Sequence, residues 1–346
     1  MRGQIRKGIK MSHKCVIPDR LSDVKYNSNG LIFGEPGSGV TTFAMKEIAS
    51  VLENRSDSVV YVVDTMGSYA EFANKMGGKV VQIGYGSDNH INPLDLEQGY
   101  EDGEWDLSLK HDQVRSMLEV MRGKGCRLTP QEAWMLDKGL TEVYREFSNS
   151  TPTIRDLYDV LLKHPDDEAK SLANVLAGYL SEPLSVFSHH SNIKADNRLV
   201  IFDLNGLPSD MKELGVLTCL ADIWNKTVSN RRKAVNTWFY VDDLMPFPGS
   251  DAFFYFLRPL WIRARLYGGV PAGVVHGTEN FLRLAETLDI TNHTSFVAMF
   301  SMSETDRASL ADMFQISKKT LQRINHSEAG HGLLWHDGVV SELKIA

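Results

Sequence analysis

The chain has 346 residues and a formal net charge of −7, with 42% hydrophobic and 23% charged residues. These fractions lie near globular averages and exclude a globally disordered chain, and no apolar run approaches the ~20 residues of a membrane-spanning helix. The acidic balance excludes a dedicated duplex-DNA binder of the strongly basic type, so nucleic acid could be handled only by a local patch or by an assembly.

Short apolar runs alternate with helix-compatible stretches in the first hundred residues. Residues 31–33, 59–63 and 80–83 are strand-like, and helical patterns follow the first two runs, through Leu52 and from Tyr69 to Met76. Strands that alternate with helices are typical of a parallel sheet covered by helices.

The pattern becomes wholly helical between about Asp106 and His190, where apolar residues recur at helical spacing. Thr129 followed by Pro130 predicts a helix start, with an N-cap and a proline at the first helical position. Two more helices are predicted over 153–162 and 166–180. Because no strand-like run interrupts this stretch, we expect an all-α insertion.

Strands return in the last third of the chain. The predicted strands are 199–204, 237–243, 273–276 and 295–300, and the predicted helices are 209–231, 250–267, 304–314 and 317–325. The runs 332–336 and 339–345 flank an Asp-Gly pair and predict a hairpin. The whole pattern predicts an α/β protein with a lead-in at 1–30, a core of 31–100 and 196–346, and a helical insertion subdomain at 101–195.

The segment GEPGSGVTT lies between a predicted strand and a predicted helix. Its glycines permit positive φ and a close approach of the backbone, so that successive N–H groups point inward and, with the helix N-terminus, hold a di- or triphosphate. The predicted nucleotide-binding residues are Gly34, Gly37, Ser38, Gly39, Val40, Thr41 and Thr42. Thr41 stands where the Mg²⁺-binding hydroxyl belongs in the pattern GxxxxGK[ST].

Val40 departs from that pattern, because it stands where the phosphate-binding lysine belongs. The lost contact is charge-assisted and worth ~1.5–3 kcal/mol for binding. An ordinary glycine-rich turn from strand to helix is the alternative interpretation of this segment.

Two acids, Asp242 and Asp243, follow the apolar strand that ends at Val241. In phosphate-loop ATPases an Asp at a strand end holds the Mg²⁺ shell, and the next acid positions the attacking water. Asp242 is therefore a candidate Mg²⁺ ligand together with Thr41. Asp243, one methylene shorter than the usual Glu, is a candidate catalytic residue, and a pair of solvated turn residues is the alternative.

Three further residues are candidates for catalytic roles. Arg263 and Arg265 lie near the end of a predicted helix, and arginines presented to a neighbouring subunit's nucleotide accelerate phosphoryl transfer. Helix-end arginines are more often solvated, which is the alternative for this pair. Glu279, within Thr278-Glu279-Asn280 after a predicted strand, would belong to a polar sensor near the nucleotide, unless Thr278 only caps a helix.

Taken together, these residues resemble the motor domain of the large cytoplasmic ATPase of conjugative type IV secretion systems, in the FtsK/HerA-like branch of RecA-fold ATPases. The resemblance runs from about Asp19 to Lys344 and rests on segments such as NGLIFGEPGSG, INPLDL, TPTIRDLYDVL, TWFYVDD, RARLYGG and HGTENF. It implies a RecA-like P-loop NTPase core, ATP and Mg²⁺ as cofactors, and assembly into a homo-oligomer such as a hexamer. It also implies other secretion subunits as partners and a cytoplasmic location, peripheral to the membrane through those partners.

Four departures from the family pattern lie at one reaction centre. Val40 replaces Lys, Asp243 replaces Glu, Glu279 replaces Gln, and Asp64-Thr65-Met66 replaces Asp-Pro-Glu. Val40 and Glu279 both reduce the positive potential at the γ-phosphate, so we expect impaired or absent hydrolysis. Full-length relatives carry an N-terminal domain that docks them to the secretion channel, so we expect a motor-only fragment or a shortened homologue.

Three interpretations stay open from the sequence. The chain could be an ATPase motor that energises DNA or protein export, or a pseudo-ATPase that serves as a scaffold. It could also be a DNA translocase of the same fold, which would need a basic surface. The candidate patch for that surface is Lys226, Arg231, Arg232 and Lys233, unless these residues form a solvated helix end.

Overall fold

The structure is a computed structural model that describes residues 17, 19–22 and 27–345, apart from short gaps. The gaps are residues 97–103, 149, 183, 194–196, 245–246, 248–250, 283–284, 286, 326 and 337. Most of the predicted lead-in, including Cys15, therefore lies outside the described residues.

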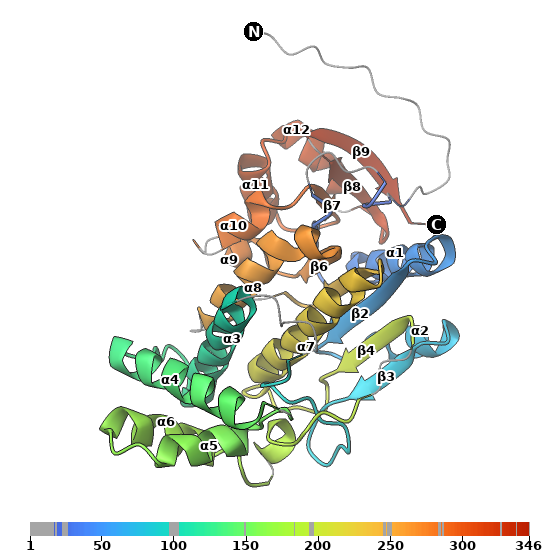
Figure 1. Cartoon of the computed structure of the whole chain (residues 1–346). Coiled ribbons are helices and arrows are strands. Elements are labelled where there is room, and N and C mark those ends of the chain that lie inside the picture. Colours follow the sequence, from blue (N-terminus) through green and yellow to red (C-terminus); the bar gives the residue numbers. More distant parts are fainter. Residues whose placement is uncertain are drawn as a thin grey trace.

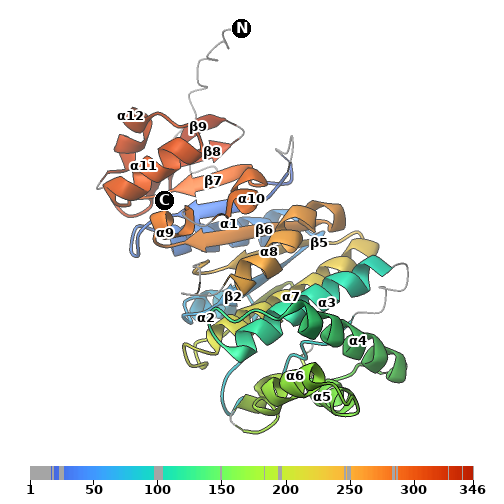
Figure 2. The same ribbon diagram turned by 90° about the vertical axis from the view of Figure 1, so that its left-hand side faces the viewer.

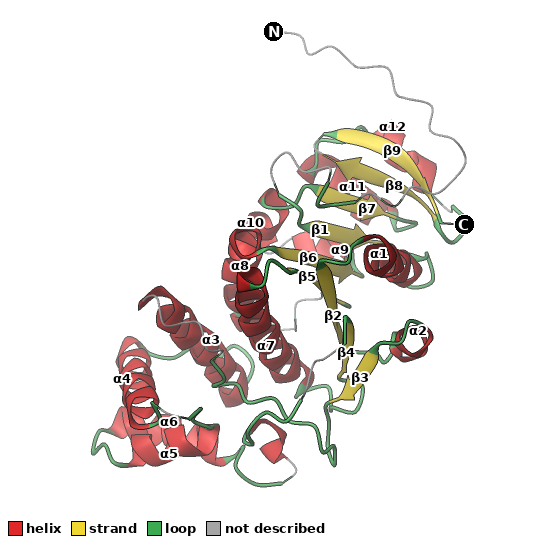
Figure 3. Ribbon diagram, turned by 45° about the vertical axis from the view of Figure 1, so that its right-hand side comes forward, coloured by secondary structure: helices red, strands yellow, loops and turns green. Residues whose placement is uncertain are grey.

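Nine strands in the described part of the chain form one sheet, in the order β3-β4-β2-β5-β6-β1-β7-β8-β9 (Figure 3). They are β1 (Gly30–Phe33), β2 (Ser58–Asp64), β3 (Lys79–Gln82), β4 (Leu199–Asp203), β5 (Asn236–Val241), β6 (Gly269–Val275), β7 (Phe296–Met299), β8 (His331–His336) and β9 (Val339–Lys344). Strands β1 to β7 pair in parallel, whereas β8 and β9 are antiparallel. The parallel strands therefore all end at one edge of the sheet, the carboxyl edge, and all begin at the opposite amino edge.

Helices cover both faces of this sheet (Figure 3). One face carries α1 (Val40–Asn54) and α2 (Ala70–Lys75), and the other carries α7 (Lys212–Arg232), α8 (Ala252–Arg263) and α10 (Thr287–Asn292). Each face has its own buried apolar cluster, as a sheet covered on both sides requires. The remaining helices of the C-terminal part are α9 (Thr278–Leu282), α11 (Glu304–Met313) and α12 (Lys318–Leu321).

Four helices between β3 and β4 lie together, away from the strands (Figures 1 and 2). They are α3 (Glu104–Arg122), α4 (Pro130–Glu146), α5 (Ile154–Leu162) and α6 (Asp167–Ala177). The predicted start of α4 is confirmed, because the Thr129 side chain accepts a hydrogen bond from the Glu132 N–H and Pro130 is the first helical residue. The domain boundaries at 101 and 195 stay a prediction.

The predicted fold class is confirmed: this is an α/β protein with a mainly parallel sheet and a helical insertion. Several element boundaries differ from the prediction, and three of them bear on the site. Strand β6 begins at Gly269, not 273, because Gly-Val-Pro-Ala lacks the β-branched pattern of a strand. The predicted helix 250–267 ends at Arg263 and continues as a 3₁₀ turn, η3 (Ala264–Tyr267). The helix expected from residue 209 begins at Lys212.

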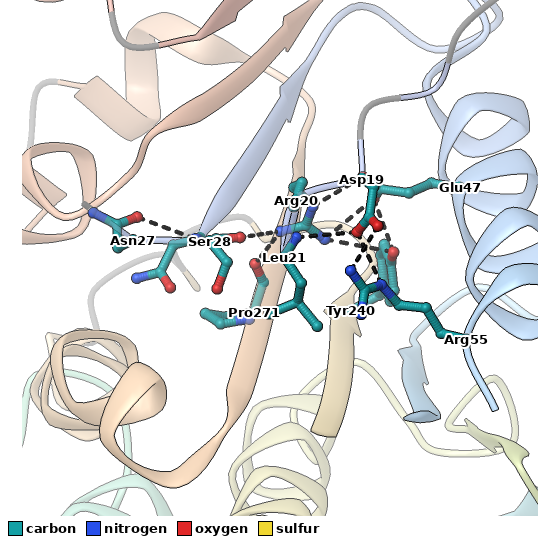
Figure 4. A network of polar contacts seen from close by, with 10 residues as sticks. Asp19, Arg20, Leu21, Asn27, Ser28, Glu47, Arg55, Tyr240 and Pro271 are labelled. Atoms are coloured by element: carbon teal, nitrogen blue, oxygen red, sulfur yellow. Dashed lines mark hydrogen bonds and ion pairs between the residues drawn. The ribbon is translucent and has the colours of Figure 1, made fainter. Parts of the chain in front are cut away.

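One residue of the predicted polar lead-in belongs to the core. Arg20 is 1% exposed, and its guanidinium forms an ion pair with Glu47 of α1 at 2.9 Å (Figure 4). It also donates to the carbonyls of Ser28 and Pro271, at 2.7 and 2.8 Å. Tyr240 completes the network by donating to Glu47 at 2.8 Å. These contacts fix the lead-in to α1, β5 and β6.

No helix among the described residues is both long enough and apolar enough to cross a bilayer.

Candidate functional site

The loop between β1 and α1 has the backbone of an anion-binding turn. The φ angle is +83° at Gly37 and +109° at Gly39, in the left-handed region that glycine adopts most readily. Helix α1 starts directly after Gly39, and no side chain caps its first N–H groups. A 15-residue helix with uncapped N–H groups presents a partial positive charge at this end.

Neighbouring strands hold the start of this loop. The Gly34 N–H donates to the Val275 carbonyl at the end of β6 at 3.3 Å, and the Glu35 N–H donates to the Ser301 carbonyl beyond β7 at 2.9 Å. The first residue of the loop is therefore fixed between two strands, as a rigid cradle requires.

The C-terminal segment contacts the other end of the loop. The Gly330 N–H donates to the Ser38 carbonyl at 2.9 Å, and a Cβ at Gly39 would lie 2.7 Å from the Gly330 nitrogen. A Cβ at Gly37 would meet no atom within 4 Å. The loop is thus packed at Gly39 and open at Gly37.

Two side chains lie inside the loop. The Ser38 hydroxyl is buried without a hydrogen-bond partner, and it would come within 2.6 Å of a Cβ at Gly34. The Val40 side chain is 2% exposed and belongs to the apolar cluster between α1 and the sheet. A valine in this position supplies no charge to an anion in the loop.

A buried carboxyl cluster lies at the carboxyl edge. Asp242 is 3% exposed, and its burial beside Asp64 and Asp243 raises its pKa to about 7. The Tyr69 hydroxyl donates to Asp242 at 3.5 Å. Asp64 accepts from the backbone N–H groups of Met66, Gly67 and Tyr69, at 3.1, 2.8 and 2.9 Å, and so holds the turn after β2.

Asp243 has a strained backbone and two basic neighbours. Its φ of +58° is unusual for a residue other than glycine, and such strain concentrates at functional sites. Burial raises its pKa, while the nearby charges of His276 and Lys212 lower it. Lys212 Nζ donates to the Thr65 carbonyl at 2.6 Å, and His276 Nδ1 lies 3.0 Å from the Gly34 carbonyl.

The structure brings the glycine loop and the two acids to the same edge of the sheet. Strand β6 separates β1 from β5, and both end beside it: Phe33 pairs with Val275, and Val241 pairs with Gly273. At ~4.8 Å between neighbouring strands, the loop and Asp242 are on the order of 10 Å apart across the sheet. This spacing suits a phosphate chain with a metal ion at its end.

Arg263 and Arg265 lie at the other edge. Arg263 ends α8 and Arg265 lies in η3, which leads directly into the first residue of β6 at the amino edge. The length of a seven-residue strand, about 23 Å, separates them from the loop of their own chain. Their expected role across a subunit boundary stays a prediction.

Glu279 lines a different hollow from the phosphate loop. It belongs to α9, its backbone N–H donates to the Asp306 carboxylate at 2.6 Å, and it borders a cavity with Leu282 of the same helix and Ser309 and Asp312 of α11. Thr278 is 1% exposed at the start of α9, and the Asn280 side chain lies outside the described residues. The expected sensor role of this segment stays a prediction.

Sequence reasoning missed three residues of the site: Tyr69, Lys212 and His276. His276 directly follows β6, and Lys212 begins α7, the helix after β4. Side chains at such positions reach the carboxyl edge of the sheet. His276 carried a usable signal, since it is a polar residue that directly follows an apolar strand between the two recognised motifs. Tyr69 and Lys212 reach the site only through tertiary packing.

In the structure, Lys226 is set apart from the other three residues of the predicted basic patch. Lys226 forms an ion pair with Asp222 one turn away on α7. Arg231, Arg232 and Lys233 end α7 at the amino edge, before β5. A basic surface there would face away from the glycine loop of the same chain.

The described residues fit a nucleotide with Mg²⁺ in most respects. The uncapped helix N-terminus, the unpartnered Ser38 hydroxyl and the carboxyl cluster are the groups that phosphates and a divalent cation would satisfy. No group of three or more His, Cys, Asp or Glu in the described part of the chain forms an all-protein metal cage. Mg²⁺ does not need one, because it is usually bound by one or two carboxylates, phosphate oxygens and water.

Comparisons with known proteins show the same fold elsewhere. No family model and no curated protein matches the sequence. Among solved structures the chain is similar to VirB4 of Thermoanaerobacter pseudethanolicus, with a TM-score of 0.81 and 21% identity over 96% of this chain and 93% of that chain. It is also similar to the plasmid coupling protein TrwB in complex with ADP and Mg²⁺, with a TM-score of 0.60 and 14% identity over 92% and 85% of the two chains. The chain therefore has the P-loop NTPase fold of VirB4 and TrwB.

Proposed function

We propose that this chain is a subunit of a conjugative type IV secretion machine, which binds ATP with Mg²⁺ and hydrolyses it poorly. One observation carries the proposal: the glycine loop and the Asp242–Asp243 pair end at the same edge of the sheet, with β6 between them. The fold shared with VirB4 over 96% of the chain gives this arrangement its context.

The residues divide into two groups by their chemistry. The loop residues Gly34, Gly37, Ser38, Gly39, Val40, Thr41 and Thr42 would hold the phosphates, mainly through backbone N–H groups. Thr41 and Asp242 would hold Mg²⁺, which supplies charge neutralisation at the phosphate oxygens. A bound cation would also relieve the burial of Asp242 among other carboxyl groups.

Impaired hydrolysis follows from two of the side chains present. Val40 provides no charge to the phosphates, and its side chain is buried in the apolar cluster under the loop. Asp243 is shorter than Glu, and a displacement of ~1 Å at a reacting group can cost ~10²-fold in rate. Glu279 would add a negative charge near the phosphates, and this part of the argument rests on the sequence resemblance alone.

Assembly with other chains belongs to the same proposal. Arg263 and Arg265, at the amino edge, would act on the nucleotide of a neighbouring copy in a homo-oligomer. The partners would be other secretion or conjugation subunits at the cytoplasmic face of the membrane, and DNA contact would require the local basic residues at the end of α7.

A direct binding measurement tests the proposal. Isothermal titration of the whole chain with ATP and Mg²⁺ should give saturable binding, and phosphate release should stay far below the ~1–100 s⁻¹ typical of kinases. Absence of binding with ATP and with ADP would reject the nucleotide-binding function.

A pseudo-ATPase scaffold is the second candidate, favoured by the contact between Gly330 and the Ser38–Gly39 end of the loop. A scaffold would bind other secretion subunits equally well with and without nucleotide. A DNA translocase is the third candidate, and it requires salt-dependent DNA binding by the assembled chain.

A further inference from the structure

His276 is held against the first residue of the glycine loop. It follows β6 directly, is half-buried, and its Nδ1 lies 3.0 Å from the Gly34 carbonyl oxygen. A carbonyl oxygen can only accept a hydrogen bond, so Nδ1 carries the hydrogen. The second ring nitrogen, Nε2, is then an acceptor in the neutral ring and a donor in the imidazolium.

The position of β6 places His276 between the two halves of the proposed site. The strand runs between β1, which leads into the loop, and β5, which leads into the acids. The imidazole is close enough to Asp243 for its positive charge to lower the pKa of that carboxyl group. His276 therefore lies against Gly34 and within electrostatic range of Asp243.

The loop lacks a positive side chain at the place where the pattern requires one. Val40 is aliphatic and buried under the loop. A charge-assisted hydrogen bond from an imidazolium to a phosphate oxygen has the strength of the contact that a lysine would make.

We propose that His276 supplies the charge and the hydrogen bond that the loop lacks at Val40, by donating from Nε2 to the terminal phosphate group of a bound nucleoside triphosphate. This inference rests on the proposed nucleotide-binding function. It makes His276 a binding residue that distinguishes a triphosphate from a diphosphate.

Lys212 is a second cation near Asp243, but its position is less suitable for a contact with phosphates in the loop. Its Nζ donates to the Thr65 carbonyl, at the end of β2. In the sheet, β2 lies beyond β5 and is separated from β1 by both β5 and β6. Lys212 is therefore anchored on the far side of Asp243, whereas His276 contacts the loop itself.

The test compares the binding of two nucleotides by the whole chain in the presence of Mg²⁺: AMP-PNP as the triphosphate and ADP as the diphosphate. In His276→Gln the side-chain amide can still donate to the Gly34 carbonyl, but it carries no charge. We expect the affinity for AMP-PNP to fall about ten- to a hundred-fold, with the affinity for ADP within about two-fold of the wild type.

A matched control uses a histidine in the same kind of hydrogen bond at the opposite edge of the sheet. His293 Nδ1 lies 2.7 Å from the Asp289 carbonyl, and the His293 carbonyl accepts from Asn29, just before β1. His293→Gln should change neither affinity. A second variant, Val40→Lys combined with His276→Gln, should recover most of the lost AMP-PNP affinity, because the lysine restores the missing charge.

The outcomes separate this inference from the function on which it rests. Equal losses for both nucleotides, or no loss for either, in His276→Gln would overturn the role of His276 and leave nucleotide binding intact. If His276→Gln does not fold, His276→Asn takes its place in the same comparison: equal losses for both nucleotides, or no loss for either, would again overturn the inference. Absence of binding of both nucleotides to the wild type would instead reject the proposed function.

Discussion

Arg20 and Asp242 are both almost fully buried against the same sheet, at 1% and 3% exposure, but their surroundings differ. Arg20 is paired with Glu47 and donates to two backbone carbonyls, and its guanidinium also lies 4.8 Å from the centre of the Trp238 ring. Asp242 has other carboxyl groups as neighbours, and no Lys, Arg or His among the described residues forms an ion pair with it.

The difference indicates two roles for buried charge. A charge whose partners are all present in the chain fixes one segment to another, as Arg20 fixes the lead-in to α1 (Figure 4). A carboxylate left among carboxylates destabilises the fold, because burial and like charges both disfavour its ionised form. Under the proposed function, Mg²⁺ from outside the chain would complete this arrangement.

The largest effect is expected from Arg20→Ala. The change leaves Glu47 buried without its partner, so we expect the free energy of unfolding to fall by about 3–5 kcal/mol. Chemical denaturation of the variant and the wild type measures it. A loss below about 1 kcal/mol would show that the network contributes no more than a surface pair.

Asp242→Asn should act in the opposite direction in the absence of Mg²⁺. The raised pKa means that the folded chain holds this proton more tightly than the unfolded chain does, with its ordinary value near 4. The free energy of unfolding therefore falls as the pH rises from about 4 to about 7, by at most about 4 kcal/mol.

The asparagine removes that dependence, so the variant should be more stable than the wild type at pH 8 in EDTA and similar to it at pH 4. Denaturation curves at several pH values measure the difference. A variant that is less stable than the wild type at pH 8 would contradict the unbalanced charge at Asp242.

Val40→Lys adds a lysine at the position where the phosphate-loop pattern has one, next to the charge that His276 is proposed to supply. We expect the affinity for ATP with Mg²⁺ to rise about ten- to a hundred-fold, since the new contact is charge-assisted and worth ~1.5–3 kcal/mol. Isothermal titration measures the affinity, and a phosphate-release assay measures turnover. No change in either would contradict the interpretation of Val40 as the cause of impaired function.

The smallest effect is expected from Arg55→Ala, which removes the half-exposed ion pair of Arg55 with Asp19 beside the Arg20 network. Pairs of this kind contribute about 0–1 kcal/mol. The same denaturation experiment serves as a control for Arg20→Ala, and comparable losses in both variants would remove the distinction between buried and exposed pairs.

Local pattern was sufficient for the fold and for placing the glycine loop and the two acids at strand ends. The alternation of strands and helices predicted a parallel sheet. The glycine loop and the acids that follow a strand predicted a candidate site at the carboxyl edge of that sheet. Arg20 could not be predicted, because it lies in a polar segment and is buried only by residues up to 251 positions away. Lys212 and Tyr69 were missed for the same reason. The start of β6 was missed because glycine and proline do not favour strands. In the structure these residues form a strand because β6 pairs with β1 on one side and with β5 on the other.

The central claim is that the glycine loop and Asp242 form one site for a nucleotide with Mg²⁺. The most direct test is thermal or chemical unfolding of the wild type with Mg²⁺ and ATP at about 100 times the dissociation constant. Binding to the folded chain should raise the free energy of unfolding by about 2.7 kcal/mol. In the Asp242→Asn variant, the part of this increase that depends on Mg²⁺ should be absent. A wild type whose unfolding is the same with and without Mg²⁺ and ATP would contradict the claim.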